Sequence, residues 1–271
     1  MIEFPNAKIN LGLNIVSKRK DGYHNLESIF VPIDWCDVLE ILPAEADIFY
    51  LNQKEQDVSD RSNLVIQALD LLRKDFELPP LAVYLEKIIP IGAGLGGGSA
   101  DASFMLNLLN RFAELNLTPL QLKEYAAKLG SDCPFFIENK NSLVEGRGEK
   151  ITILDKKNLK GLTILLINPQ IHISTKEAYK GITPLKSECS LVELVTKPIS
   201  EWKQMGLKND FEDSILPKYP AIQNIKNYLY QIGASYACMS GSGSTVFGIF
   251  ESDLPAFVSQ PNWLTYTGKT I

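Results

Sequence analysis

The residues of this chain with the clearest chemical potential begin with a run of glycine. Five of the seven residues from Gly92 to Gly98 are glycine, within PIGAGLGGGSADA at positions 90–102. Glycine in an ordered segment costs conformational entropy and leaves the backbone bare, so this density indicates that another group approaches the backbone closely. The run also matches the dinucleotide fingerprint as Gly92-x-Gly94-x-x-Gly97, and its context must decide which chemistry it serves.

The surrounding sequence excludes two standard phosphate-binding loops. A Rossmann fold places an acidic residue about 20 positions after the fingerprint, but Leu117 occupies that position and another helix is predicted to begin at Thr118. A Walker A loop requires Gly-Lys-Ser/Thr, and no lysine lies between Ile88 and Arg111. A flexible linker would have polar flanks, whereas this run joins a predicted strand to a predicted helix.

What remains is a glycine-rich loop that leads into the N-terminus of a helix. Bare backbone N–H groups and the positive end of the helix dipole form an anion site suited to a triphosphate. Ser99 could add a hydroxyl to a phosphate or to Mg²⁺. The structural alternative is a tight strand-to-helix packing turn, for which one or two glycines would be enough.

Two further residues could take part in phosphoryl transfer, which needs a proton acceptor and cations that hold the developing charge. Asp132 is the candidate base, and the alternative is that it caps the turn before Pro134. Lys8 is the candidate cation, because it shares a strand face with Asn10 and Gly12 rather than with other charges. The alternative for Lys8 is an ordinary solvated surface lysine.

The elements that must position these residues start with strands. From Ala7 to Asn14, apolar side chains alternate with polar residues or glycine, which predicts a half-buried strand. Asp21-Gly22 predicts a hairpin turn into a second strand. Further strand patterns cover DVLEIL at 37–42, DIFYL at 47–51 and LAVYLEKIIP at 81–90.

Helical spacing follows the strands. It predicts a helix at 62–76 with Ser62 or Asn63 as N-cap, a second at 101–115, and a third that Thr118-Pro119 opens with a capping box. The polar stretch 155–160 marks a weak boundary, and beyond it come a strand at 161–168, a helix start at 174–182, a helix at 220–232 and two strands within 237–250. This mixed α+β pattern predicts two lobes, residues 1–155 and 156–271.

Composition limits the partners and the compartment. The 271 residues carry a formal net charge of −5, which argues against nucleic acid or an anionic membrane as partner. The four cysteines are far apart and only two histidines are present, so neither a disulfide framework nor a zinc or histidine-based metal site is expected, while a protein ligand to Mg²⁺ stays open. The opening MIEFPNAK has no signal-peptide pattern and no apolar run is long enough to span a bilayer, which predicts a cytoplasmic protein.

Several motifs of this sequence resemble those of a known kinase superfamily. PIGAGLGGGSADA resembles the ATP-binding motif of the GHMP kinase superfamily, and PNAKINLGL at 5–13 and MSGSGSTVFGIF at 239–250 resemble two further stretches of it. Two more motifs are DGYHNL at 21–26 and GSDCPFF at 130–136. Together, all these motifs resemble the members of the superfamily that act in the non-mevalonate isoprenoid pathway on an alcohol with a cytidine diphosphate group. The resemblance runs from Pro5 to about Phe250.

The resemblance implies a two-lobed α+β GHMP kinase fold. Its N-terminal ATP-binding lobe would resemble ribosomal protein S5 domain 2, its C-terminal lobe would be ferredoxin-like, and the substrate would lie in the cleft between them. ATP with Mg²⁺ would donate the γ-phosphate to a substrate hydroxyl. The other expected partner is the small-molecule substrate with its cytidine diphosphate group, and the protein would be a monomer or a weak homodimer.

The resemblance also implies roles for individual residues. Lys8 would pair with Asp132, and a neighbouring positive charge does lower the pKa of a carboxylate and keep it ionised. The implied nucleotide-binding residues are Pro90, Ile91, Gly92, Ala93, Gly94, Leu95, Gly96, Gly97, Gly98, Ser99 and Ala100, with Asn63 near the adenine. Ala100 stands where the family often has a second serine.

The resemblance implies fewer residues for binding the alcohol substrate than for binding the nucleotide. Tyr23 would stack on the cytosine, His24 would hydrogen-bond it, and Tyr179 would supply the second stacking face. Asn10 and Thr175 would contact the diphosphate or the polyol, while helix packing is a near-even alternative for Thr175 and Tyr179 and N-capping a strong one for Asn63.

Two other functions stay open at this stage. One is a different kinase of the same superfamily, acting on homoserine, mevalonate or a sugar, although these substrates offer no base for Tyr23 and His24 to meet. The other is a nucleotide-binding sensor without catalysis, although a sensor needs no proton acceptor such as Asp132.

Overall fold

The chain forms two compact units, each built from segments far apart in the sequence. The structure is a computed structural model that describes residues 1–57, 62–155, 157–185 and 189–271. Unit 1 comprises Met1–Ala7, Trp35–Ile91 and Gly96–Asn139, and unit 2 comprises Lys8–Asp34, Gly92–Leu95 and Lys140–Ile271. The lobes predicted from the sequence are continuous segments that meet at residues 155 and 156, and residue 156 lies outside the described residues. That division stays a prediction.

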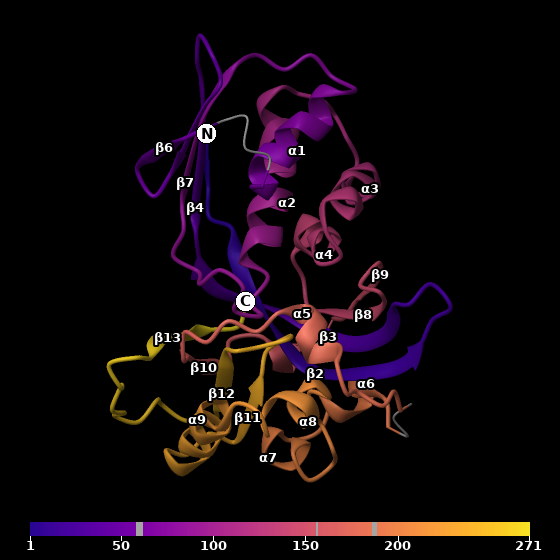
Figure 1. The fold of residues 1–271 in the computed structure, drawn as a ribbon, viewed down its shortest axis with the longest axis vertical. Helices are drawn as coiled ribbons and strands as arrows, with labels where there is room; N and C mark the ends of the chain where they lie inside the picture. Colours follow the sequence, from indigo (N-terminus) through magenta and orange to yellow (C-terminus); the bar gives the residue numbers. More distant parts are fainter. Residues whose placement is uncertain (58–61, 156, 186–188) are drawn as a thin grey trace. The chain divides into compact units, whose positions relative to one another are not determined.

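Unit 1 is a sheet with helices on one face (Figure 1). The sheet has the order β1-β4-β7-β5-β6, in which only the β5–β7 pair is parallel among the described strands. Its strands are β1 (Ile2–Glu3), β4 (Val38–Pro43), β5 (Ile48–Leu51), β6 (Lys54–Gln56) and β7 (Leu81–Glu86). The helices are α1 (Leu64–Arg73), α2 (Gly97–Phe112), α3 (Pro119–Leu129) and α4 (Cys133–Glu138).

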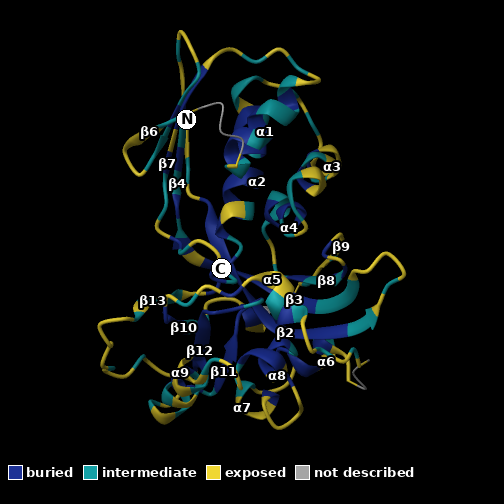
Figure 2. Cartoon of the chain, in the orientation of Figure 1, coloured by how far each residue is buried: buried dark blue, intermediate teal, exposed yellow. Residues whose placement is uncertain are grey.

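The core of unit 1 lies between this sheet and the helices. Leu39 and Val83 from the sheet pack with Leu69 of α1 and Met105 and Leu109 of α2. Figure 2 shows buried residues along α1, α2 and the strands of this sheet. The apolar stripe of α2 that the sequence predicts therefore faces the core, which fixes how the N-terminus of this helix is presented.

Unit 2 contains two sheets, with orders β2-β3-β8-β9 and β11-β12-β10-β13. The first is built from β2 (Asn6–Lys18), β3 (His24–Cys36), β8 (Ser142–Gly146) and β9 (Lys150–Ile153), the first two of which begin or end in unit 1. The second is built from β10 (Thr163–Asn168), β11 (Tyr236–Met239), β12 (Val246–Phe250) and β13 (Leu264–Lys269), all antiparallel. The helices are α5 (Thr175–Tyr179), α6 (Leu191–Leu194), α7 (Ile199–Trp202), α8 (Phe211–Ile215) and α9 (Pro220–Gln231), with a 3-10 turn at Lys157–Leu159.

The core of unit 2 joins β2 to the second sheet and its helices. Leu13 and Ile15 of β2 pack in one apolar cluster with Leu165 of β10, Ile215 of α8 and Ile225 of α9. Strand β2, which carries Lys8 and Asn10, is therefore fixed by the same core that supports β11 and β12.

Several local predictions are confirmed. Thr118 and Gln121 form the capping box of α3, and Asn63 caps α1 by accepting a hydrogen bond from the Val65 N–H at 2.9 Å. The turn at Asp21-Gly22 joins β2 to β3, with Gly22 at φ +86°. The mixed α+β class is also confirmed.

Two predictions are wrong in part. Strand β2 is not half-buried, because its polar face is covered as well, and Lys8 and Asn10 expose only 3% and 1% of their surface. Helix α2 begins at Gly97 rather than at Asp101, so the last two glycines of the run form its first turn. Among the described residues, no helix is both long and apolar enough to cross a membrane.

Candidate active site

The glycine run divides into residues with different structural demands. Gly92, Gly94 and Gly96 have φ values of +68°, +80° and +72°, a region that side chains strongly disfavour. A Cβ on Gly94 would lie 2.1 Å from the carbonyl oxygen of Ser240, so this glycine also permits close packing against another loop. Part of the glycine requirement is thus structural, as the packing-turn alternative proposes.

Gly98, the last glycine of the run, has no such structural demand, whereas a Cβ on Gly97 would lie 3.0 Å from the Ile89 side chain. Gly98 lies in the first turn of α2, and the nearest atom to a Cβ there would be Cδ1 of Leu64 at 3.9 Å. Gly96, the N-cap of α2, has no side chain to cap the helix, so the first N–H groups receive no side-chain acceptor. Uncapped N–H groups at a helix N-terminus are suited to bind an anion such as a phosphate.

Lys8 lies inside unit 2 with its ammonium held in place. Lys8 Nζ donates to Asn10 Oδ1 at 2.6 Å and to the Gly94 carbonyl oxygen at 3.4 Å, and it lies 4.4 Å from the centre of the Phe30 ring. Because the side chain is buried, the solvated-surface alternative for Lys8 is not what the structure has. The lysine and a carbonyl of the glycine loop are brought together, as expected for a cation at a phosphate site.

Asn10 and Ser28 continue this polar network. Asn10 Nδ2 donates to Ser28 Oγ at 2.9 Å, and Ser28 Oγ donates to the Gly12 carbonyl oxygen at 2.6 Å. Asn10 therefore orients its Oδ1 toward Lys8, which is its described role in addition to the predicted contact with substrate.

A further residue, Ser240, meets the same two acceptors as Lys8. Its Oγ lies 2.9 Å from the Gly94 carbonyl oxygen and 3.4 Å from Asn10 Oδ1. Ser240 begins the loop 240–245 between β11 and β12, and the Thr245 N–H donates to the Ala93 carbonyl oxygen at 3.3 Å. The sequence points to this loop only through its motif SGSGST, which does not indicate which serine makes the contact.

Asp132 lies in unit 1 immediately before α4. Its carbonyl oxygen accepts from the Phe135 N–H at 3.3 Å, but its carboxylate makes no capping hydrogen bond to α4. The capping alternative for this side chain is therefore not observed. Burial raises the pKa of the neighbouring Cys133 thiol to about 11, and the Asp132 charge adds to the rise, so this cysteine stays protonated at neutral pH and does not compete as a nucleophile.

A buried charged cluster that the sequence does not reveal lies beside the helix that follows the glycine run. In it, Lys87 Nζ pairs with Asp37 and with Asp101 Oδ2, the latter at 2.6 Å. Asp37 Oδ1 also accepts from the Ile88 and Ile89 N–H groups at 2.5 and 2.8 Å. Burial raises the pKa of Asp101 to about 7, although Lys87 opposes the rise and Asp37 adds to it.

The residues expected to meet the cytosine form two separate aromatic contacts. The rings of His24 and Tyr179 stack with centroids 4.8 Å apart and planes inclined by 18°, and Tyr179 meets Phe211 edge-on. Tyr23 is 54% exposed, with the Arg147 guanidinium 3.9 Å from its ring centre. All five residues belong to unit 2, and Tyr23 is the most exposed of the three that are predicted to meet the cytosine.

The remaining predicted residues are at helix starts. Asn63 is the N-cap of α1, and Thr175 is the exposed first residue of α5 behind the N-cap Ser174. Both positions have a structural explanation of their own, so their predicted contacts with ligands stay predictions.

No ready-made metal cluster is present in the described part of the chain, where no three His, Cys, Asp or Glu side chains gather to bind an ion. Magnesium in phosphoryl-transfer sites keeps several waters and binds mostly to substrate phosphates. The bare N-terminus of α2 is compatible with a metal that arrives bound to a triphosphate.

Comparisons with known proteins agree with this geometry. Residues 63–140 match the GHMP kinases N terminal domain, and residues 191–260 match the GHMP kinases C terminal domain. A 4-diphosphocytidyl-2-C-methyl-D-erythritol kinase of Parabacteroides distasonis is 51% identical over 251 residues, covering 93% of this chain and 92% of the relative. A kinase of the same name from Cytophaga hutchinsonii is 47% identical, covering 95% of both chains.

Solved structures give the same result. A crystal structure of 4-(cytidine 5'-diphospho)-2C-methyl-D-erythritol kinase has a TM-score of 0.82 and 25% identity, covering 100% of this chain and 99% of its own. The Methanococcus jannaschii mevalonate kinase has a TM-score of 0.71 with 14% identity, covering 100% of this chain and 98% of its own, and shows the shared fold alone.

Proposed function

Because this chain belongs to the 4-diphosphocytidyl-2-C-methyl-D-erythritol kinases of the GHMP family, we propose that Lys8 and Asp132 carry out its phosphoryl transfer. The chain is an ATP-dependent kinase with an alcohol acceptor. It transfers the γ-phosphate of ATP to the 2-hydroxyl of 4-diphosphocytidyl-2-C-methyl-D-erythritol, a step of non-mevalonate isoprenoid precursor biosynthesis. Solved structures of homoserine and mevalonate kinases resemble the chain at only 13–19% identity.

The observation that carries the catalytic proposal is the fixed ammonium of Lys8. It is buried on β2 and bound both to Asn10 and to a carbonyl of the glycine loop. A cation fixed before the substrate arrives stabilises developing charge without a reorganisation cost. The uncapped N-terminus of α2 and the Ser99 hydroxyl would hold the phosphates, with Gly98 leaving room for them.

Asp132 is assigned as the general base that accepts the proton of the substrate hydroxyl. The substrate 2-hydroxyl gives its proton to the Asp132 carboxylate while its oxygen forms the new bond to the γ-phosphorus, and the bond from that phosphorus to the β,γ-bridging oxygen breaks to release ADP. Lys8 orients the hydroxyl and stabilises the negative charge that develops during the transfer. Mg²⁺ held by the substrate phosphates and by water would supply positive charge that stabilises the phosphoryl group during transfer.

Binding of the cytidine group of the substrate is assigned to residues of unit 2. Tyr23 stacks on the cytosine, His24 hydrogen-bonds it, and Tyr179, whose ring also stacks on His24, supplies the second stacking face. Asn10 and Thr175 reach the diphosphate or the methylerythritol, and Asn63 lies near the adenine.

Replacement of Asp132 by asparagine tests the assignment of the base. The change keeps the size of the side chain and removes its ability to accept a proton. We expect turnover to fall by roughly 10²- to 10⁴-fold, the usual contribution of general-base catalysis, while the Kd for ATP stays within about threefold. Turnover equal to that of the unaltered protein would exclude Asp132 as the base.

A further inference from the structure

We propose that Asn209 is a positioning residue for phosphoryl transfer, which holds loop 240–245 and thereby the two acceptors that orient the Lys8 ammonium. This inference rests on the role proposed for Lys8. Asn209 lies 201 positions from Lys8 in the sequence, and no sequence motif described above includes it.

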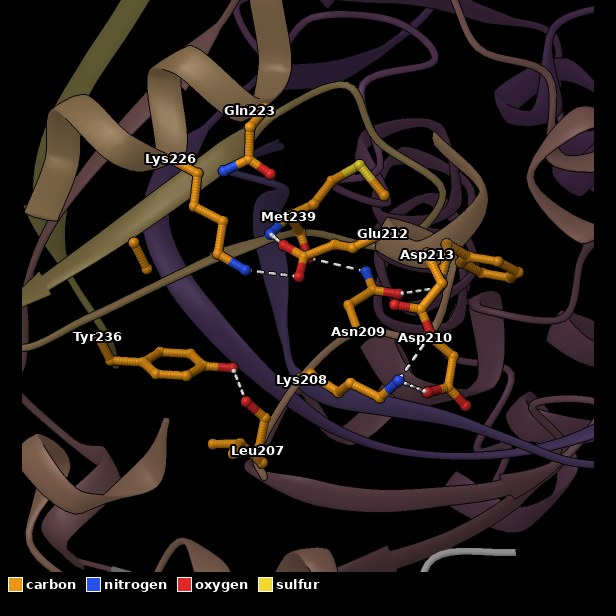
Figure 3. A network of polar contacts seen from close by, with 12 residues as sticks. Leu207, Lys208, Asn209, Asp210, Glu212, Asp213, Gln223, Lys226, Tyr236 and Met239 are labelled. Carbon is orange, nitrogen blue, oxygen red and sulfur yellow. Dashed lines mark hydrogen bonds and ion pairs between the residues drawn. The ribbon is translucent and has the colours of Figure 1, made fainter. Parts of the chain in front are cut away.

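Every hydrogen-bonding group in the Asn209 side chain that faces the protein is engaged. Asn209 is fully buried, and its Nδ2 donates to the Met239 carbonyl oxygen at 2.8 Å and to the Gly241 carbonyl oxygen at 2.7 Å. Its Oδ1 accepts from the Phe211 N–H at 3.0 Å. Because an amide has two N–H donors, both are used and the side chain is fixed in one orientation. Figure 3 shows the Asn209 side chain beside Met239 and Glu212.

The backbone around Asn209 is joined to strand β2. The Leu13 N–H donates to the Lys208 carbonyl oxygen at 2.9 Å, and the Asp210 N–H donates back to the Leu13 carbonyl oxygen at 2.8 Å. The carboxylate of Asp210 also accepts from the Ile15 N–H at 2.7 Å. Asn209 is therefore anchored on the same strand that carries Lys8 and Asn10.

The two carbonyls that Asn209 binds stand on either side of Ser240. Ser240 is the residue whose Oγ meets the Gly94 carbonyl oxygen and Asn10 Oδ1. Lys8 Nζ donates to these same two oxygens. A displacement of Ser240 therefore changes both acceptors of the Lys8 ammonium together, and Asn209 is the side chain placed to prevent it.

The ion pair between Glu212 and Lys226 also holds the backbone of Met239, next to Ser240. Glu212 Oε1 accepts from the Met239 N–H at 2.9 Å, and its Oε2 accepts from Lys226 Nζ at 2.6 Å (Figure 3). Burial lowers the pKa of Lys226, but the attraction of nearby acidic groups, Glu212 foremost, is larger in sum and raises it. The Met239 peptide is thus bound at its N–H by Glu212 and at its carbonyl by Asn209, which leaves loop 240–245 little freedom at its start.

Replacement of Asn209 by alanine, with serine as a milder second variant, tests the proposal. We expect kcat to fall by about 10- to 100-fold, because small misplacements of catalytic groups cost rates of this order, while the KM values for ATP and for the cytidine substrate stay within about threefold. The matched control is Asn110→Ala, since Asn110 also binds backbone twice, at the N–H and carbonyl of Leu117, without any contact with loop 240–245. The control should lose stability and keep its kcat.

A double replacement tests whether the effect passes through Ser240. Ser240→Ala should lower kcat to a similar degree, and adding Asn209→Ala to it should lower kcat little further, because residues on one path are not additive. Additive losses, or an Asn209→Ser variant with the same kcat as the Asn110→Ala control, would overturn the proposal.

Hydrogen exchange supplies a readout that needs no substrate. The Ser240 N–H is bonded to the Thr245 carbonyl oxygen and the Gly243 N–H to the Ser240 carbonyl oxygen, at 2.9 and 3.0 Å. Both amides should exchange faster in the Asn209 variants than in the Asn110 control, and equal exchange would overturn the proposal. Absence of turnover in the unaltered protein would instead overturn the proposed function, while the exchange comparison would still decide whether Asn209 holds the loop.

Discussion

Replacement of Lys87 by methionine addresses the buried charges beside helix α2. The side chain of Asp37 is fully buried, that of Asp101 is 3% exposed, and the Lys87 ammonium is bound to both. Methionine fills a similar volume and removes the charge, so two buried carboxylates lose their shared partner. Breaking a buried ion pair in this way costs about 3–5 kcal/mol of the free energy of unfolding.

The pH dependence of this loss has a definite sign. Asp101 has a pKa of about 7 in the folded protein, against 3.8 as its ordinary value, so between these pH values the folded state binds more protons than the unfolded state. Its contribution to stability is present at low pH and decreases as the pH rises toward 7. Without the ammonium, which lowers this pKa, the decrease continues above pH 7, and the cost of Lys87→Met is larger at pH 8 than at pH 6.

Urea unfolding at both pH values measures this cost. Arg111→Met is the matched control, because Arg111 pairs with Glu3 while 52% exposed, and exposed pairs contribute about 1 kcal/mol or less. Adding Asp101→Asn to Lys87→Met removes one excess negative charge and should restore part of the stability at pH 8. A loss at pH 8 no larger than that of the control, or one smaller than at pH 6, would refute the assignment of a buried, charged cluster.

Three further predictions concern the nucleotide loop and the cytidine pocket. Gly94→Ala places a methyl group 2.1 Å from the Ser240 carbonyl oxygen at φ +80°, so thermal unfolding should show a loss of at least about 1–3 kcal/mol; unchanged stability would contradict this packing. Gly98→Ala meets only Leu64 at 3.9 Å, so it should keep or raise stability by about 0.5–1 kcal/mol, and calorimetry should show weakened ATP binding; unweakened binding would remove Gly98 from the phosphate site. Tyr179→Ala removes the ring stacked on His24 at 4.8 Å, so steady-state kinetics should show KM for the cytidine substrate raised by about tenfold, with KM for ATP kept; equal changes in both would indicate a packing role alone.

The sequence predicts the chemistry of the glycine run more completely than its geometry. The density of glycine indicates close approach to the backbone, and the structure divides this approach between the Ser240 loop at Gly94 and an open position at Gly98. Nothing in the sequence separates the two, because Ser240 lies 146 positions away from Gly94. The start of α2 is missed for a related reason, since glycine at 97 and 98 is a poor helix former and becomes helical through packing of the later turns.

The alternating pattern of β2 correctly places Lys8 and Asn10 on one face of the strand, but it wrongly predicts that this face is exposed to solvent. The pattern places Lys8 and Asn10 on one face, and polar residues on a strand normally predict a solvent-facing side. Here that face is covered by the glycine loop and loop 240–245, so both side chains are buried among hydrogen-bond partners. A buried strand face that carries polar residues departs from the usual solvent-facing pattern, and such departures are expected at functional sites.

The supporting residues could not be predicted at all. Asp101 belongs to the glycine-rich motif, but nothing in the motif indicates its partners. The other residues of the two clusters are single polar residues outside the motifs: Asp37, Lys87, Asn209, Glu212 and Lys226. The ion-pair partners are 14 to 50 positions apart, and Met239 and Gly241 lie 30 and 32 positions from Asn209, so only the folded chain brings them together. Asn63, in contrast, is predicted correctly as an N-cap because capping depends on its immediate neighbours.

Release of ADP from ATP and Mg²⁺ in the presence of different alcohols tests the central claim most directly. The purified protein would be given 4-diphosphocytidyl-2-C-methyl-D-erythritol, mevalonate and homoserine in parallel, with ATP binding measured separately. The proposed function predicts turnover with the cytidine compound alone. Turnover only with another alcohol, or ATP binding without turnover of any of the three, would contradict it.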